Sequence, residues 1–329
     1  MVLVTGGTGF LGSELIRQLL NQGKAIRAIK RPASKIPAIL ESHPIIDWYH
    51  ADILDFYALQ DAMEGVTEVY HCAAMVSFSK ADKKMMRRVN IEGTANLVNI
   101  CLENRIRKLL HVSSVSAVGQ SKTGTLTSEK HHWQFDKNQT SYAVSKYESE
   151  MEVFRGIAEG LNAVIVNPSI IIGKNAGDEG SGQLFKKVKD GLSFYPKGSC
   201  GLVDVEDVAK TMIRLMESDI SAERFIINAE NISYKELFKK IAEAYKLTPP
   251  KIKLQPWMLK SGYLLSSLVK VVNGKDYGLT KELVKSASKT SGFSNQKITD
   301  ALSSNFKPID TSIFEICQPE EKVELKLIL

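Results

Sequence analysis

The chain has 329 residues, 43% of them hydrophobic, which is enough for a substantial core in one large or two fused domains. Its formal net charge is +6 and its lysines are interleaved with acidic residues, a pattern that excludes a nucleic-acid-binding stripe and suits anionic small ligands. No apolar run reaches the ~18 residues of a membrane span. The four cysteines have no paired spacing, and the first apolar run begins at residue 2, so we expect no metal site, no signal peptide and a cytoplasmic location.

Residues 2–5 form an apolar, β-branched run that predicts a buried parallel strand, and residues 13–20 have helical spacing. Between them, Gly6, Gly9 and Gly12 are three residues apart. A strand, a glycine-rich turn and a helix present backbone N–H groups to a pyrophosphate, so the pattern favours dinucleotide binding over an ordinary turn. The residues expected to contact the dinucleotide here are Gly6, Thr8, Gly9, Phe10, Leu11 and Gly12.

The next predicted strand, 25–29, is followed by a basic segment. NAD-specific folds place a carboxylate near this point to bind the ribose 2′-hydroxyl, yet no Asp or Glu occurs between Glu14 and Glu41. The residues found there instead are Lys30, Arg31 and Lys35. Because an arginine can bind a phosphate through two N–H groups, Arg31 and Lys35 predict NADP in preference to NAD. The alternative is a solvated basic loop.

Further strands are predicted at 45–49, 66–71, 108–113 and 162–166, with helices beginning near Tyr57 and at Asn90. Strands that alternate with helices in this way predict an α/β fold with a doubly wound parallel sheet. Ligands of such a sheet bind at the carboxyl ends of its strands, and small residues follow the strand at 66–71: Cys72, Ala73 and Ala74. Asn90 is predicted either to cap its helix or to brace the neighbouring strand.

The chemistry is expected where the fifth strand ends and where the following helix begins. Ser113 and Ser114 stand at the carboxyl end of that strand. Tyr142 and Lys146 are four residues apart, so they share one face of a helix. A tyrosine titrates near pH ~10, but a neighbouring ammonium lowers the pKa of the phenol, and the pair can then exchange a proton with a carbonyl or an alcohol.

Together, the glycine turn, the strand-end serines and the Tyr142–Lys146 pair resemble the extended short-chain dehydrogenase/reductase family, of the NAD-dependent epimerase/dehydratase type. The resemblance implies an NAD(P)-binding Rossmann fold in which Tyr142 is the general acid/base and Lys146 holds the nicotinamide ribose. It assigns the polarisation of the substrate carbonyl to Ser114, with Ser113 as the rival. It also implies cofactor contacts from Asp52, Ile53, Cys72, Ala73, Ala74, Val112, Pro168, Ser169 and Ile170. Asp52 has an alternative role as the cap of the following helix.

Within that family, residues 71–78 and 90–94 look most like the dihydroflavonol-reductase-like branch, which reduces carbonyl compounds with NADPH. We therefore expect an NADP(H)-dependent reductase of a small ketone or aldehyde, with a homodimer as the oligomer to test. Two alternatives stay open: a nucleotide-sugar epimerase or dehydratase, and a cofactor sensor without catalysis. Sugar-nucleotide enzymes of the family hold the diphosphate with an arginine where this chain has Cys200, which favours a compact apolar substrate, although Lys197 is nearby.

The second half predicts a smaller, discontinuous lobe. The elements predicted for the second half of the chain are a polar loop at 175–182, strands at 202–205 and 225–227, helices from Asp207 to Met216, at 234–245 and at 280–286, and an amphipathic segment at 257–272. The predicted division is a dinucleotide-binding domain at 1–173, with return segments near 202–228. The substrate-binding lobe is then 174–201 together with 229–329.

Overall fold

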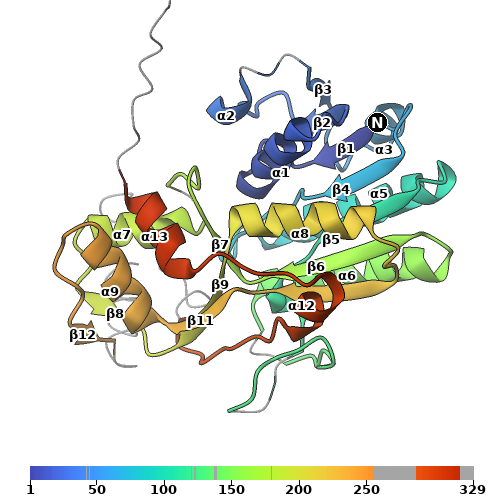
Figure 1. The fold of residues 1–329 in the computed structure, drawn as a ribbon. Coiled ribbons are helices and arrows are strands. Elements are labelled where there is room, and N and C mark those ends of the chain that lie inside the picture. The colour runs from blue at the N-terminus through green and yellow to red at the C-terminus, as the bar shows by residue number, and fades with distance from the viewer. Residues whose placement is uncertain are drawn as a thin grey trace, which may run out of the picture.

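The computed structural model describes residues 1–41, 43, 45–119, 121, 124–136, 139–178, 180–254 and 287–318. Its centre is a parallel seven-stranded sheet with the strand order β10-β6-β5-β4-β1-β2-β3 (Figure 1). The strands are β1 (Val2–Thr5), β2 (Ile26–Lys30), β3 (Asp47–His50), β4 (Glu68–His71), β5 (Lys108–Val112), β6 (Ala163–Pro168) and β10 (Glu223–Ile227). From β1 the strand order runs through β2 to β3, and from β4 it runs the other way through β5 and β6 to β10, so the order reverses between β1 and β4. This confirms the predicted doubly wound fold, whose ligands bind at the carboxyl ends beside that reversal.

Helices cover both faces of the sheet, as a parallel sheet requires. On one face α1 (Phe10–Asn21) packs beside α8 (Val205–Glu217), which runs along the sheet in Figure 1. The other face carries α3 (Phe56–Ala62), α5 (Gly93–Glu103) and α6 (Ser141–Ala158). The shorter pieces are α2 (Ala38–Glu41), α4 (Lys83–Arg87), a π-helical turn η1 (Arg88–Glu92) and a 3₁₀ turn η2 (Val115–Ala117).

A second region lies beyond the carboxyl ends of the strands and has its own hydrophobic cluster (Figure 1). It contains the three-stranded sheet β11-β9-β7 and the pair β12-β8. Its elements are β7 (Ile170–Ile172), α7 (Gly182–Lys189), β8 (Phe194–Tyr195), β9 (Ser199–Asp204), β11 (Glu230–Ser233), α9 (Tyr234–Ala244), β12 (Ile252–Lys253) and α13 (Ile309–Cys317). α12 (Gln296–Leu302) packs instead on β10 of the large sheet. We keep the domain boundaries given above as a proposal.

Several predicted boundaries were wrong. The third strand begins at Asp47, because Asp47 pairs with Arg27 across the sheet while Ile45 is exposed. α8 begins at Val205, because the Asp204 carboxylate accepts from the Glu206 N–H and so caps the helix there. β6 continues to Pro168 and β9 begins at Ser199, both beyond the predicted ranges. The predicted segments 257–272 and 280–286 lie outside the described residues.

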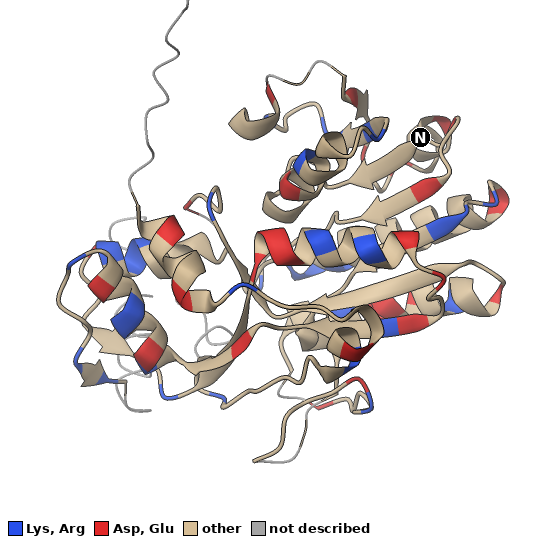
Figure 2. Cartoon of the chain, viewed as in Figure 1, with Lys and Arg blue, Asp and Glu red and all other residues tan. Residues whose placement is uncertain are grey.

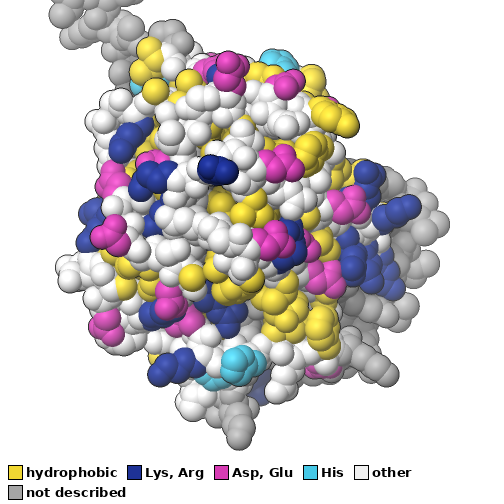
Figure 3. Space-filling model, turned by 90° about the vertical axis from the view of Figure 1, so that its right-hand side faces the viewer, with side chains coloured by type: hydrophobic (Ala, Val, Ile, Leu, Met, Phe, Trp, Pro, Cys, Tyr) yellow, Lys and Arg dark blue, Asp and Glu magenta, His cyan; other side chains and the backbone are white. Residues whose placement is uncertain are grey.

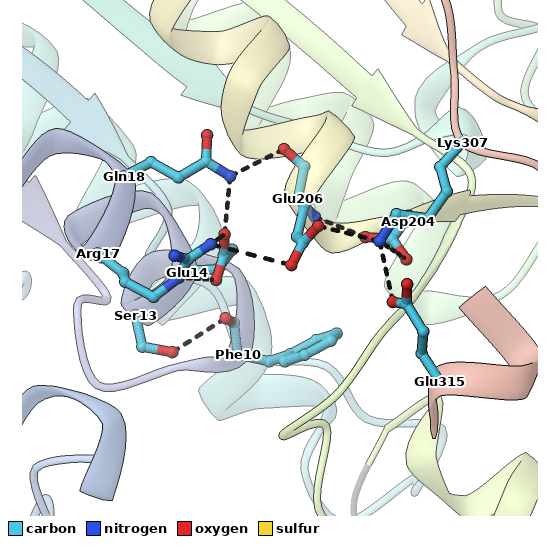
Figure 4. Close-up of polar contacts among 9 residues, drawn as sticks. All are labelled: Phe10, Ser13, Glu14, Arg17, Gln18, Asp204, Glu206, Lys307 and Glu315. Carbon is cyan, nitrogen blue, oxygen red and sulfur yellow. Dashed lines mark hydrogen bonds and ion pairs between the residues drawn. The ribbon is translucent and has the colours of Figure 1, made fainter. Parts of the chain in front are cut away.

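Charged side chains join the first helix of the large sheet to the second region (Figure 4). On α1, Gln18 donates to both the Glu14 carboxylate and the Glu206 carbonyl. Lys307 lies 2.9 Å from the Glu206 carboxylate, 3.5 Å from that of Asp204 and 3.1 Å from that of Glu315 on α13. Although burial alone would lower the pKa of Lys307, the hydrogen bonds that its ammonium donates to Glu206 and Glu315 raise it. The cluster therefore fastens α13 to the beginning of α8.

Elsewhere on the surface, acidic and basic side chains are mixed. Along α8, basic side chains lie between acidic ones at the two ends of the helix (Figure 2). On the face shown in Figure 3, Lys and Arg are interspersed with Asp and Glu, and hydrophobic side chains lie between them. Among the described residues, no helix has the length and apolar character needed to cross a membrane.

Candidate active site

The glycine-rich turn joins β1 to α1 and packs directly on the end of β4. Gly6 has φ +70°, and a Cβ there would lie 2.7 Å from the Ala73 nitrogen. A Cβ on Gly12 would lie 2.2 Å from the Gly6 carbonyl oxygen. Both positions therefore require glycine, and Gly9 stays exposed with its N–H bonded to the Gly6 carbonyl at 2.9 Å.

The beginning of α1 is built to receive an anion. Its N-cap is Gly9, no side chain caps the helix, and no acidic residue lies in its first turn. The N–H groups of that turn are thus open to a ligand, and the helix dipole favours negative charge there. The Phe10 ring lies against Gly173, where the chain leaves for the second region. This turn fits the pyrophosphate of a dinucleotide.

The predicted adenine and ribose contacts stand at the ends of β2 and β3. Arg31 and Lys35 are exposed, and within the described part of the chain no ion pair engages either side chain. Asp52 is half-buried and its carboxylate accepts from the Leu54 N–H at 2.9 Å. The alternative of Asp52 as a helix cap is wrong, because Asp55 caps α3 by accepting from Ala58. Ile53 packs against Gly93 on α5.

Ser114 and Tyr142 meet at the carboxyl end of β5. The two side chains form a hydrogen bond, and the Ser114 hydroxyl also accepts from the Ser116 N–H at 3.1 Å. Ser113 is buried, with a hydroxyl that has no partner among the described residues. Of the two serines, Ser114 is the one that touches Tyr142. The Phe78 ring packs on Tyr142, with 6.1 Å between ring centroids.

Lys146 lies one turn further along α6, and its ammonium donates to the Val112 carbonyl at 2.8 Å. Burial lowers the pKa of Lys146 to about 8. Burial also raises the pKa of Tyr142, and the opposing influence is the hydrogen bond from Ser114. The Tyr142 pKa is therefore shifted upward and not downward as predicted, because the burial of the phenol outweighs the influences that lower it.

A chain of hydrogen bonds runs beneath these groups. Thr5 accepts from the Ala73 N–H and is bonded to His71 Nδ1 at 2.7 Å, while His71 Nε2 is bonded to Thr94 at 2.9 Å. Thr94 donates to the Asn90 carbonyl. This order makes Nε2 the protonated nitrogen of a neutral His71. Burial first, and the charge of Lys146 second, lower the pKa of His71 to about 3.

Asn90 is the last member of this series of hydrogen bonds, and its contacts decide between the two roles predicted for it. It lies inside η1 and does not cap a helix. Its side-chain amide donates to the Met75 carbonyl and to the Ser145 hydroxyl, both at 3.0 Å, and its oxygen accepts from the Met75 N–H. It therefore braces the segment after β4 against α6 beside Lys146.

Other predicted residues lie around the same edge of the sheet. Cys72 and Ala73 follow β4 against the glycine turn, while Ala74 is exposed. Pro168 ends β6, Ile170 begins β7, and the hydroxyl of Ser169 between them is buried without a partner among the described residues.

Sequence reasoning missed a buried acid on α6. Glu150 lies four residues after Lys146, its side chain is 0% exposed, and it pairs with Arg224 at 2.9 Å. The spacing of Tyr142, Lys146 and Glu150, each four apart, was the local signal for it. Cys200 is 5% exposed and hydrogen-bonded to Tyr234, inside the cluster of the second region.

Comparisons with known proteins identify the family. The model of the NAD dependent epimerase/dehydratase family matches residues 2–228. A protein of Synechocystis sp. with the provisional name dihydroflavonol 4-reductase is 31% identical over 261 residues, which cover 78% of this chain and 75% of that one. Cinnamoyl-CoA reductase 1 of Oryza sativa is 26% identical over 270 residues, covering 78% and 79%.

Solved structures share the whole fold. The crystal structure of gox2253 has a TM-score of 0.82 at 29% identity, with 96% of each chain covered. UDP-glucose 4-epimerase of Thermotoga maritima has a TM-score of 0.78 at 18% identity, with 96% of this chain and 97% of that one covered. At that identity the likeness shows the fold alone.

Proposed function

Because the chain belongs to the NAD-dependent epimerase/dehydratase family and is an NAD(P)-dependent enzyme of the extended short-chain dehydrogenase/reductase type, we propose that it reduces a carbonyl compound to an alcohol with NADPH. The observation that carries the proposal is the meeting of Ser114 with Tyr142, one turn from Lys146, at the carboxyl end of β5. That edge of the sheet also holds the open glycine turn.

When bound, the nicotinamide supplies the hydride. Tyr142 Oη holds the proton that the developing alkoxide takes up, and its raised pKa keeps that proton on the phenol at neutral pH. The Ser114 hydroxyl orients and polarises the carbonyl oxygen. Lys146 places a positive charge beside this edge and holds the nicotinamide ribose. The glycine turn, with Asp52 and the residues that follow β4, binds the rest of the dinucleotide.

The choice of NADPH rests on Arg31 and Lys35. Both side chains are exposed just beyond β2, and no ion pair in the described part of the chain occupies them. A guanidinium can bind a 2′-phosphate through two N–H groups. Calorimetry should therefore show tighter binding of NADPH than of NADH, and equal or reversed affinities would contradict this choice.

For the substrate, we propose a compact and mainly apolar carbonyl compound. Phe78 supplies an aromatic wall beside Tyr142. Cys200, which stands where sugar-nucleotide enzymes have an arginine, is buried and bonded to Tyr234 and offers no positive charge to a diphosphate. The alternative is a nucleotide-sugar epimerase or dehydratase. The intact Tyr142–Lys146 pair argues against a cofactor sensor without catalysis.

Two experiments test the proposal. A panel of ketones and aldehydes, followed by the absorbance of NADPH, should reveal turnover of at least one apolar carbonyl compound. Calorimetric titration with UDP and other nucleoside diphosphates should show no site apart from that of the dinucleotide. Micromolar binding at a separate site would favour the epimerase instead. A cytoplasmic location is also proposed, since all four cysteines are unpaired thiols.

A further inference from the structure

The segment between β5 and α6 connects the two groups at the centre of the site. It begins just after Ser114 and ends just before Tyr142, so the position of its middle affects both. Arg224, on the outer strand β10, donates to the carbonyl oxygens of Glu129 at 2.8 Å and of His131 at 3.2 Å. The Glu129 carboxylate accepts in return from the Ile226 N–H at 2.7 Å. The segment is thus fastened to β10.

The Arg224 guanidinium is also held by Glu150 on α6. Its Nη1 donates to Glu150 Oε1 at 2.9 Å, and the Arg224 side chain is 15% exposed whereas that of Glu150 is fully buried. A buried carboxylate without its partner is strongly unfavourable, so Glu150 holds Arg224 in place. Glu150 lies two turns of helix beyond Tyr142.

The other carboxylate oxygen of Glu150 orients the side-chain amide of Asn167. Asn167, in β6, donates from Nδ2 to Glu150 Oε2 at 2.7 Å and to the Ser114 carbonyl at 3.0 Å. Its own Oδ1 is buried with no partner among the described residues. Because a carboxylate only accepts hydrogen bonds, Glu150 selects the amide orientation that donates to Ser114. A neutral residue in place of Glu150 would also allow the flipped Asn167 amide. In that orientation Asn167 Oδ1 would face the Ser114 carbonyl oxygen, and neither oxygen can donate a hydrogen bond.

We propose that Arg224, Glu150 and Asn167 are positioning residues that hold Ser114 against Tyr142. The inference rests on the proposed function of those two side chains. Contacts link the three residues into a ring: the segment after Ser114 leads to Arg224, Arg224 pairs with Glu150, Glu150 orients Asn167, and Asn167 holds the Ser114 carbonyl. None of the three touches the reacting atoms.

The chain offers a control on the other side of the sheet, one strand in from the edge. Arg27 in β2 also pairs with one carboxylate, Asp47 at 2.7 Å, and donates to two backbone carbonyls, those of Ala62 and Glu64. Its side chain is 14% exposed, almost the same as that of Arg224. R27M therefore removes the same set of donor contacts from a place without contact to Ser114, and the carboxylate it leaves behind, Asp47, is 46% exposed.

The experiment compares R224M, R224K and R27M with the parent enzyme. We expect R224M to lower kcat about a hundredfold, as a small misplacement of a catalytic group does, while the KM for NADPH changes less than about twofold. R224K keeps a charge beside Glu150 and should retain kcat within about tenfold. R27M should leave kcat unchanged. Deuterium uptake of residues 113–118 should rise in R224M and stay low in R27M.

Two further results separate the possible failures. If R224M does not fold, the double variant E150Q/R224M leaves no unpaired buried charge, and its low kcat should persist because Asn167 is no longer oriented. Wild-type kcat and protection in the folded R224M or in the double variant would overturn the inference, as would an equal loss in R27M. Deuterium uptake needs no turnover, so it decides the positioning role even if the carbonyl panel defeats the proposed function.

Discussion

The two faces of the large sheet differ in chemistry although the same strands build both. The face under α1 and α8 is mostly apolar, with Val2, Val4, Tyr70, Leu110, Val164, Val166, Phe225 and Ile227. Its buried Lys108 lies at the amino end of β5, where it donates to the Leu215 carbonyl of α8. The face under α5 and α6 begins with apolar residues, including Leu3, Val69, Leu109 and Ile165. At its carboxyl end it becomes polar, with Thr5, His71, His111 and Asn167 all buried.

This difference follows from the alternation of side chains along a strand. Thr5, His71 and His111 lie opposite one another across β1, β4 and β5, so they form one polar row. Buried polar groups stabilise a fold only where partners satisfy them. His71 is bonded to Thr5 and Thr94, and Thr5 accepts from the Ala73 N–H after β4, whereas neither ring nitrogen of His111 has a partner among the described residues. The apolar face holds the fold together, whereas the polar row supports the site. The following predictions separate these two roles.

The largest effect is expected from Tyr142→Phe on the polar side. The ring and its packing on Phe78 remain, but the proton donor is lost, so turnover should fall by about a hundredfold or more with dinucleotide affinity kept. Steady-state kinetics with the best carbonyl of the panel measures this. Near-normal turnover would assign the acid to another residue.

Leu110→Ala tests the apolar face at the same strand. Leu110 is fully buried under α8, so the free energy of unfolding should fall by about 3 kcal/mol. Turnover per folded molecule should stay close to that of the parent. Urea unfolding and active-site titration check the two parts, and a variant that is stable but inactive would reverse the roles given to the faces.

His71→Gln tests the polar row through pH. Burial lowers the pKa of His71 from 6.5 to about 3 in the folded state, so the unfolded chain binds the proton more readily below pH 6.5. The stability that neutral His71 contributes is complete above pH 6.5 and is lost as pH falls toward 3. Between pH 8 and pH 5 the parent should lose about 2 kcal/mol more than H71Q, measured by urea unfolding at both pH values. Equal losses would contradict the burial of a neutral histidine.

The titration of Lys146 should give the pH profile of kcat/KM for the reduction a basic limb. Its pKa is about 8, so the ammonium is lost above that pH, and kcat/KM should then fall about tenfold per pH unit. Arginine does not titrate in this range, so the limb should be absent from the residual activity of K146R. A limb that persists in K146R belongs to a different group.

Arg31→Ala belongs to neither face and should have the smallest effect. Arg31 lies beyond β2, exposed to solvent, so the change should weaken NADPH by about fivefold and leave NADH nearly unchanged. The melting temperature without ligand should not move. Calorimetry with both dinucleotides measures the selectivity, and an equal loss for both would remove Arg31 from the 2′-phosphate site.

Local patterns were sufficient for the sheet and for the shared helix face of Tyr142 and Lys146, whereas Ser114 was assigned through the family resemblance. The apolar run of β1, the glycine spacing and the four-residue step from Tyr142 to Lys146 all lie within one or two turns of chain. The Glu150–Arg224 pair spans 74 residues and exists because β10 pairs with β6, a contact that no local pattern carries. The π-helical turn that places Asn90 against Ser145 has the same origin in packing.

The missing cap of α1 has a consequence for the life of the protein. The first turn of α1 has no side-chain cap, so a bound dinucleotide would supply hydrogen-bond partners for its N–H groups. A ligand present at a hundred times its Kd increases the free energy of unfolding by about 2.7 kcal/mol. Proteases attack chains that open, so the half-life of this chain under digestion should lengthen with added NADPH. In a cell, a shortage of dinucleotide would then lower the amount of the protein as well as its rate.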